Sequence, residues 1–305
     1  RREGLFLLLL VGIGLILFAW PAEHVPQMGD ASIYPNTASK LIETGGLTYH
    51  YDPLDGLSSQ QKELFYVPSD EQLSYIDIQS YEGLLYGAYY VMDPVQNMVV
   101  ASRPSLAMAW MGLLGLLGGP MSMLYVTPLF GVASLVTVYF LGKRLFGAGA
   151  GALAALWLVL SFPQLHFSRT PYAEVVGQYF VLTAMHALVS YLKTPRPLYV
   201  ALGVGAVAAG FSARLDVLLF LPVLFLFSFF LLLRGDYGGL GACVASAVMG
   251  LGFVVWTINK PYVGATGELM LRGQLRFLRQ TNTYLLGGVG LAGILGLIGL
   301  TAVMH

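Results

Sequence analysis

Long apolar runs recur along this sequence and constrain its fold more than any other feature. About 20 apolar residues suffice to cross a bilayer as a helix, which satisfies its own backbone hydrogen bonds inside hydrocarbon. The chain is 56% hydrophobic and 10% charged, whereas soluble domains carry about 25% charged residues. The sequence therefore predicts an all-α fold, a polytopic transmembrane helical bundle forming a single domain over residues 1–305, with about 8–9 membrane helices. The runs cover about residues 4–20, 105–117, 121–142, 147–162, 174–192, 198–213, 215–233, 239–258 and 283–304.

The ends of the chain and its overall charge narrow the class further. Arg1 and Arg2 precede an apolar stretch, which is also typical of a cleaved signal peptide. No small-x-small cleavage site follows, so we expect a retained first membrane helix. The sequence lacks an initiator Met and stops at His305 directly after an apolar run, so we expect part of a longer protein. The formal net charge is zero, which gives no indication of nucleic-acid binding, and the lone Cys243 excludes an internal disulfide.

Residues 21–104 form the longest polar stretch and are predicted to be an external loop with structure of its own. Asp30 is a predicted N-cap for an amphipathic helix over 31–44 that lies on the bilayer, with Gly45 as its stop. We expect a turn over 52–56 and a second helix over about 69–90.

Basic residues in the short turns between runs set the predicted orientation. Lys143, Arg144, Lys193, Arg196 and Arg234 lie in such turns and, with the two N-terminal arginines, fit one cytoplasmic side. We expect an integral, multi-pass membrane protein with a cytoplasmic N-terminus; if the source cell is prokaryotic, the membrane is the plasma (inner) membrane. Residues 21–104, the stretch 163–173, the corner at Arg214 and an amphipathic segment over 259–282 would then lie outside.

With this orientation, ionisable residues from distant segments gather at the outer ends of the helices. One such residue is ordinarily an interfacial anchor, but six at one end of a bundle indicate a shared polar cavity. The alternative is a set of structural ion pairs, such as Arg169 with Glu174 or Arg214 with Asp216. The six residues are Asp30, Arg103, Arg169, Glu174, Arg214 and Asp216.

Several short motifs together resemble those of GT-C-type integral-membrane glycosyltransferases. Residues 29–34 (GDASIY) look like the first-loop motif of the protein-mannosyltransferase and aminoarabinose-transferase group. Residues 141–147 (LGKRLFG) resemble a helix turn common in that group. Residues 154–174 resemble the next helix and its Ser-Arg-to-acid corner, and residues 210–217 (GFSARLDV) resemble a corner two helices later. The resemblance covers about residues 20–235.

The resemblance implies sugar transfer from a polyprenyl-phosphate-linked donor to a lipid, glycan or protein acceptor at the outer membrane face, with inversion. Asp30 would be the base that accepts the acceptor's proton, and Glu174 a second acid. Tyr34 and Asp216 would contact the acceptor or sugar. Cationic side chains would bind the donor's phosphate, because an anionic leaving group needs guanidinium partners. These arginines are Arg103, Arg169, Arg214, Arg272 and Arg276.

Metal and cofactor signals are weak. We expect no cofactor, and a divalent metal is not indicated, since the loop 163–173 lacks an Asp-x-Asp motif. His50 with Asp52 could ligate a metal but reads better as solvated loop residues. Within 259–282, Arg272 and Arg276 lie on one helical face with Arg279, and could bind either anionic membrane lipids or the donor phosphate.

Two other functions fit the same features. A transporter or flippase of a lipid-linked or anionic substrate could use the outward charges, although the apolar runs lack the midplane ionisable residues expected of transporters. A non-catalytic subunit of a larger membrane complex could retain the fold. Asp30 itself has two competing roles, because a carboxylate fixed as a helix cap has a lowered pKa and is a poorer base.

Overall fold

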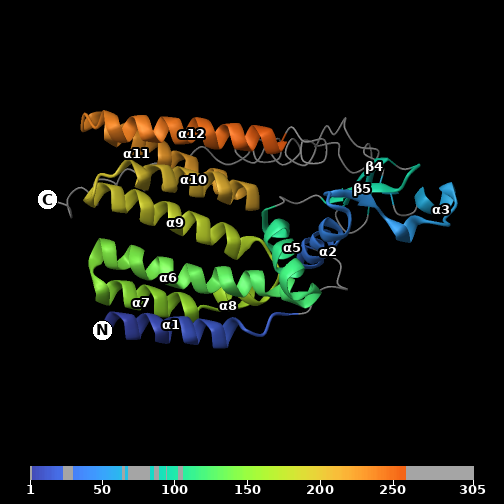
Figure 1. Ribbon diagram of the computed structural model, residues 1–305, viewed down its shortest axis with the longest axis horizontal. Helices are drawn as coiled ribbons and strands as arrows, with labels where there is room; N and C mark the ends of the chain where they lie inside the picture. The colour runs from blue at the N-terminus through green and yellow to red at the C-terminus, as the bar shows by residue number, and fades with distance from the viewer. Residues whose placement is uncertain are drawn as a thin grey trace, which may run out of the picture.

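The computed structural model describes residues 2–22, 30–63, 66–67, 83–85, 89–93, 95–101 and 106–258. Long helices run side by side in a bundle, and shorter helices with a small sheet lie at one end of it (Figure 1). The start of α1 lies at the opposite end (Figure 1). The predicted helical bundle is therefore confirmed, while the run 283–304 lies outside the described residues.

The bundle elements follow the predicted apolar runs closely. Helix α9 packs between α6 and α10, and α10 also packs against α12. Helix α8 occupies much of the stretch 163–173, which the sequence analysis treated as a plain loop. The elements are α1 (Arg2–Phe18), η2 (Pro120–Tyr125), α6 (Val126–Phe146), α7 (Ala148–Leu160), α8 (Phe162–Arg169), α9 (Glu174–Lys193), α10 (Pro197–Ala213), η3 (Leu215–Phe220), α11 (Leu221–Leu233) and α12 (Tyr237–Ile258).

Length and composition identify two described helices that could each cross a membrane, Pro120–Phe146 and Glu174–Lys193. Helices α7 and α8 meet at a bend of 62° and together would make a third span. Shorter apolar helices of 10–17 residues include α1, α5, α10, α11 and the part of α12 from Tyr237 to Gly252. The protein is therefore a helical membrane protein, and the total of about 8–9 crossings stays a prediction.

The predicted helix over 31–44 is confirmed as α2 (Asp30–Thr44). It ends where predicted, because Gly45 has a φ of 72° and its amide donates to the carbonyl of Leu41 at 2.9 Å. The prediction that its apolar face rests on the bilayer is wrong. That face instead packs against α5 (Leu106–Gly118), where an added Cβ at Gly115 would lie 2.8 Å from the Ile42 side chain.

The loop also contains a five-stranded antiparallel sheet that the sequence analysis missed. The predicted helix over 69–90 is wrong wherever the chain is described, since Gly83–Leu85 and the residues from Tyr89 are strands. Tyr and Val favour a pleated surface, and β3 and β4 pair antiparallel with Leu84 opposite Tyr90. The strand order is β1-β5-β4-β3-β2, with β1 (Thr48–His50), β2 (Tyr66–Val67), β3 (Gly83–Leu85), β4 (Tyr89–Asp93) and β5 (Met98–Ala101). Between β1 and β2 lie η1 (Asp52–Leu54), a turn as predicted, and α3 (Ser59–Glu63).

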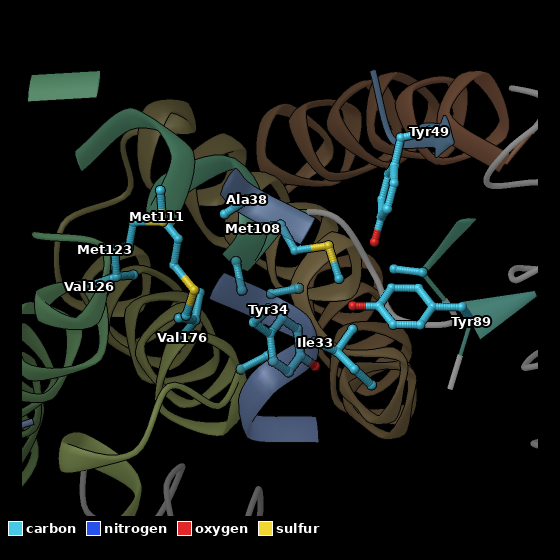
Figure 2. Close-up of a cluster of buried hydrophobic side chains, with 14 of the residues drawn as sticks. Ile33, Tyr34, Ala38, Tyr49, Tyr89, Met108, Met111, Met123, Val126 and Val176 are labelled. Atoms are coloured by element: carbon cyan, nitrogen blue, oxygen red, sulfur yellow. The ribbon is translucent and has the colours of Figure 1, made fainter. Parts of the chain in front are cut away.

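One hydrophobic cluster joins this end of the molecule to the bundle (Figure 2). Ile33, Tyr34 and Ala38 of α2 meet methionines of α5 and η2 there. The cluster also includes residues of the sheet, of α6, and of the corner between α9 and α10. Its corner members are Ala173, Val176 and Ala213. The loop is therefore packed onto the helix ends and does not hang free of them.

Candidate functional site

The start of α9 and the end of α10 meet in a cluster of three charged side chains. The Arg214 guanidinium lies 2.5 Å from Glu174 Oε1 and 2.9 Å from Asp216 Oδ2. Its Nε also donates to Asp216 Oδ1 at 3.0 Å. Glu174 is the first residue of α9, and Arg214 directly follows α10, so the packing of these two helices creates the cluster.

Burial and charge make Arg214 a firmly held cation. About a third of each of the Arg214 and Glu174 side chains is exposed (30% and 31%). Burial disfavours the charged guanidinium, but the hydrogen bonds and charges of Asp216 and Glu174 outweigh that effect and raise the pKa of Arg214 above its usual range. With two carboxylates and one guanidinium, the trio carries a net charge of −1. Arg214 is thus already neutralised, which makes it a weaker partner for an anionic phosphate than the sequence analysis expected.

A glycine on α9 leaves room for the Arg214 side chain. Gly177 lies one turn after Glu174, and a Cβ added there would lie 3.1 Å from Arg214 Cδ and 3.4 Å from its Cβ and Cγ. The aliphatic part of the arginine therefore lies directly on the helix surface. No local motif in the sequence marks Gly177 as a residue of this corner.

Two polar side-chain atoms, one in this trio and one at the end of α8, are buried without a hydrogen-bond partner among the described residues. They are Oε2 of Glu174 and Nε of Arg169. Arg169 ends α8, five residues before Glu174, and its backbone carbonyl accepts a hydrogen bond from the Ala22 amide at 2.6 Å. Within the part of the chain that the structure describes, Arg169 makes no ion pair. The proposed structural pair of Arg169 with Glu174 is thus not formed, whereas that of Arg214 with Asp216 is.

Asp30 is the first residue of α2. The first turns of α2 pack into the hydrophobic cluster that also contains residues of the corner between α9 and α10. Ile33 and Tyr34, one turn after Asp30, share the hydrophobic cluster with Ala173 and Ala213, the neighbours of Glu174 and Arg214. The backbone therefore brings the start of α2 to the same end of the bundle as the charged trio. Whether the Asp30 side chain caps the helix or acts as a base stays a prediction, as does an acceptor contact by Tyr34. Arg103, Arg272 and Arg276, with the segment 259–282, lie outside the described residues.

An apolar groove of about 430 Å³ lies near this corner, between α5, α6 and α9. Trp110 of α5, Phe130 of α6 and Tyr179 of α9 stack edge to face along it, with centroids 5.8 Å and 5.3 Å apart. Tyr179 lies five residues after Glu174 on α9.

Comparisons with known proteins identify the fold but not the family. No family model matches the sequence, and no curated protein matches it. Among solved structures, the chain is similar to the archaeal oligosaccharyltransferase AglB from Archaeoglobus fulgidus, determined in complex with an inhibitory peptide and a dolichol-phosphate. The TM-score is 0.55 and the identity is 12%, over 100% of this chain and 37% of that chain. The fold is thus that of the GT-C-like membrane proteins, and the chain spans little more than a third of the neighbour's length.

Proposed function

We propose that this membrane protein transfers a sugar from a polyprenyl-phosphate-linked donor to an acceptor at the outer face of the membrane. The observation that carries the proposal is the corner of α8, α9 and α10, where charged side chains converge beside the start of α2. Glu174 Oε2 and Arg169 Nε are buried there, and neither has a hydrogen-bond partner in the described part of the chain. Buried polar atoms are normally satisfied, so a polar ligand at this position would complete them.

The proposed reaction is a single displacement with inversion. An acceptor hydroxyl oxygen forms a bond to the anomeric carbon, and the bond from that carbon to the phosphate oxygen breaks. The hydroxyl proton passes to the Asp30 carboxylate, and the polyprenyl phosphate leaves with the electron pair. A positioned base of this kind contributes about 10²–10⁴-fold to rate.

Because of the ion pairs at this corner, we assign some residues to other roles than the resemblance implies. Arg169 is the better phosphate ligand, because its charge is not shared with a described carboxylate, whereas Arg214 is already bound to Glu174 and Asp216. In this proposal Arg214 positions Glu174, whose second oxygen contacts the acceptor or sugar. Asp216 holds the other side of the same guanidinium. The apolar groove beside Tyr179 accepts part of the lipid chain.

The likeness to AglB supports this class of reaction, because that neighbour is an oligosaccharyltransferase bound to a dolichol-phosphate and a peptide. At 12% identity the likeness concerns the fold. The donor, the acceptor and the part played by Asp30 are our proposal.

The test is a transfer assay with the full chain in proteoliposomes, using radiolabelled polyprenyl-phosphate hexoses and pentoses as donors. We expect Asp30→Asn to reduce the transfer rate about 10²–10⁴-fold. The matched control is Glu43→Gln, near the other end of the same helix, where the Glu43 side chain is 53% exposed and pairs with Lys40. It should transfer at the wild-type rate.

Three outcomes would contradict the proposal in different ways. A wild-type rate in Asp30→Asn would remove Asp30 as the base and leave Glu174 as the next candidate. Movement of labelled donor across the bilayer with no transfer to any acceptor would favour a transporter or flippase. Activity that appears only when other membrane proteins are added would indicate a subunit of a larger complex.

A further inference from the structure

A second group of chemically active side chains lies in the loop, on the side of β1 and η1. His50 is the last residue of β1, Asp52 begins η1, and Asp55 follows in the turn. His50 Nε2 lies 2.8 Å from Asp55 Oδ2 and 3.9 Å from Asp52 Oδ1. One ligand atom from each of the three residues falls within 4.8 Å of the others. The sequence analysis considered only the first two, because nothing in the sequence shows that the turn brings Asp55 back toward the imidazole.

The imidazole of His50 is held by a group outside the trio. Its Nδ1 lies 2.7 Å from the backbone carbonyl oxygen of Gln96, which accepts only if Nδ1 carries a proton. Nε2 lies 2.9 Å and 2.8 Å from Asp55 Oδ1 and Oδ2, so without a metal it donates to that carboxylate, and a cation bound there would take the place of this proton. Metal-binding histidines usually donate their other ring N–H to a carbonyl or carboxylate in this way, which fixes the ring and its tautomer.

Asp55 has an equally specific support from the turn between β4 and β5. Asn97 Nδ2 donates to Asp55 Oδ1 at 2.8 Å, and Lys62 Nζ donates to Asn97 Oδ1 at 2.7 Å. Asn97 is 4% exposed and has a φ of 53°, so it is fixed in an uncommon backbone conformation. The Gln96 carbonyl and the Asn97 amide thus come from one turn and hold two members of the trio from outside it.

The distances within the trio suit a small cation. In a tetrahedral site with metal–ligand bonds near 2.0–2.1 Å, the ligand atoms lie about 3.3 Å apart. The observed separations from His50 Nε2, 2.8 Å and 3.9 Å, lie on either side of that value. Exposed side chains can make this adjustment by small rotations, and their exposure leaves further positions open to water. One imidazole and two carboxylates suit a borderline cation such as Zn²⁺ better than Mg²⁺, which prefers oxygen ligands throughout.

We propose that His50, Asp52 and Asp55 together bind one divalent cation of the Zn²⁺ class, with water completing its coordination. The cation would tie the end of β1 to the turn after η1, and through Gln96 and Asn97 to the β4–β5 turn. Asp52 also lies 3.6 Å from Lys40 Nζ on α2, so the site adjoins the helix that begins at Asp30. The cation would stabilise this edge of the sheet and its attachment to α2. The site does not depend on the proposed glycosyl transfer.

The test is calorimetric titration of ZnCl₂ into the full chain in detergent micelles at neutral pH. We expect one equivalent to bind to the wild type and the affinity to fall about 100-fold in His50→Gln and in Asp55→Asn, since even the loss of an outer hydrogen-bond partner typically costs about 10–100-fold. The matched control is His166→Gln, which removes another exposed imidazole, on α8, and should leave this binding unchanged.

A spectroscopic readout separates binding from folding. With Co²⁺ in place of Zn²⁺, the wild type should give visible absorption bands typical of four or five ligands, and Asp52→Asn should alter their position or intensity. Zn²⁺ should also raise the unfolding temperature of the wild type but not of His50→Gln, because a ligand that binds only the folded state stabilises it. Equal Zn²⁺ affinity in the wild type, His50→Gln and Asp55→Asn would overturn the proposal. So would a wild-type dissociation constant above about 100 µM, because three convergent ligands should bind the cation more tightly than that.

Discussion

At the scale of single residues, the corner depends on one arginine that satisfies two carboxylates. Removing a charge from water is costly, and its partners repay that cost only when geometry and hydrogen bonding are good. Arg214 meets both conditions, because its Nε and Nη2 donate to Asp216 while its Nη1 reaches Glu174. Loss of the guanidinium would leave two like charges close together at a partly buried position.

This reasoning gives a prediction for Arg214→Leu. We expect it to lower the free energy of unfolding by about 1–3 kcal/mol, because half-buried carboxylates would lose their hydrogen-bonding partner. Adding Glu174→Gln should recover part of the loss, since a neutral amide tolerates burial better than an unpaired carboxylate. The measurement is thermal or denaturant unfolding in detergent for both single variants and the double variant.

The matched control is Arg234→Leu. Arg234 is an exposed residue between α11 and α12, and its guanidinium carbon lies 4.7 Å from the centre of the Phe230 ring. Arg234→Leu should lower the free energy of unfolding by much less than Arg214→Leu does. Additive effects of Arg214→Leu and Glu174→Gln would contradict the pairing, because residues in direct contact should show coupling.

The sequence identifies the residues of this corner but not their pairing. Arg214 with Asp216 could be predicted, because the two are neighbours in one turn. Glu174 was paired with Arg169, which is close in sequence, whereas in the structure it pairs with Arg214, forty positions away. The reason is the contact between α9 and α10, for which Gly177 leaves the necessary room. Contacts of this kind depend on helix packing, and no local pattern encodes them.

At the scale of helices, small residues set the closest approach in the bundle. Gly142 of α6 faces Gly151 of α7, and a Cβ added at Gly142 would lie 2.8 Å from Gly151 Cα. A Cβ added at Gly151 would lie 2.4 Å from the Tyr139 carbonyl oxygen and 2.7 Å from the Lys143 backbone nitrogen. Between membrane helices this close approach matters, because lipid supplies no hydrophobic force that drives helices together.

We therefore expect Gly151→Ala to push α7 away from α6. The new methyl group would meet backbone atoms, which cannot rotate aside, and overpacking of this kind typically costs about 1–3 kcal/mol. The matched control is Gly149→Ala, two residues earlier, where an added Cβ meets nothing within 4 Å. Unfolding in detergent should show a clear loss for Gly151→Ala and little change for Gly149→Ala. Equal free energies of unfolding for Gly151→Ala and Gly149→Ala would mean that α6 and α7 do not need to pack this closely.

Helix positions were largely predictable, and the sheet was not. The runs 31–44, 174–192 and 198–213 correspond to α2, α9 and α10 within one residue or two at each end. Apolar runs, glycines and basic turns mark such helices locally. The strands have two to five residues, and β1 pairs with β5 about fifty positions later, for instance Thr48 with Val100. A two- or three-residue strand is too short to show alternation, so its pairing emerges only in the folded chain.

At the scale of the whole molecule, the two ends of the bundle differ in chemistry. One end holds the sheet, α2 and α5, and the other holds the turns between long helices (Figure 1). Basic side chains link those turns, since Lys193 Nζ contacts the Arg144 carbonyl oxygen and Lys143 pairs with Glu3 of α1. Cytoplasmic loops carry an excess of Lys and Arg, so this end is expected inside and the sheet end outside.

Cysteine labelling tests this orientation directly. The lone described cysteine, Cys243, is buried and would first be replaced by alanine. Val95→Cys would then place a thiol in the β4–β5 turn, where Val95 is 87% exposed, and Ala148→Cys would place one at the exposed start of α7. Added to intact cells, a membrane-impermeant maleimide should label Val95→Cys at once and Ala148→Cys only after the membrane is opened. The reverse pattern would place the Arg214 corner on the cytoplasmic side. A lipid-phosphate donor would then have to be used from that face, because a charged headgroup does not cross hydrocarbon unaided.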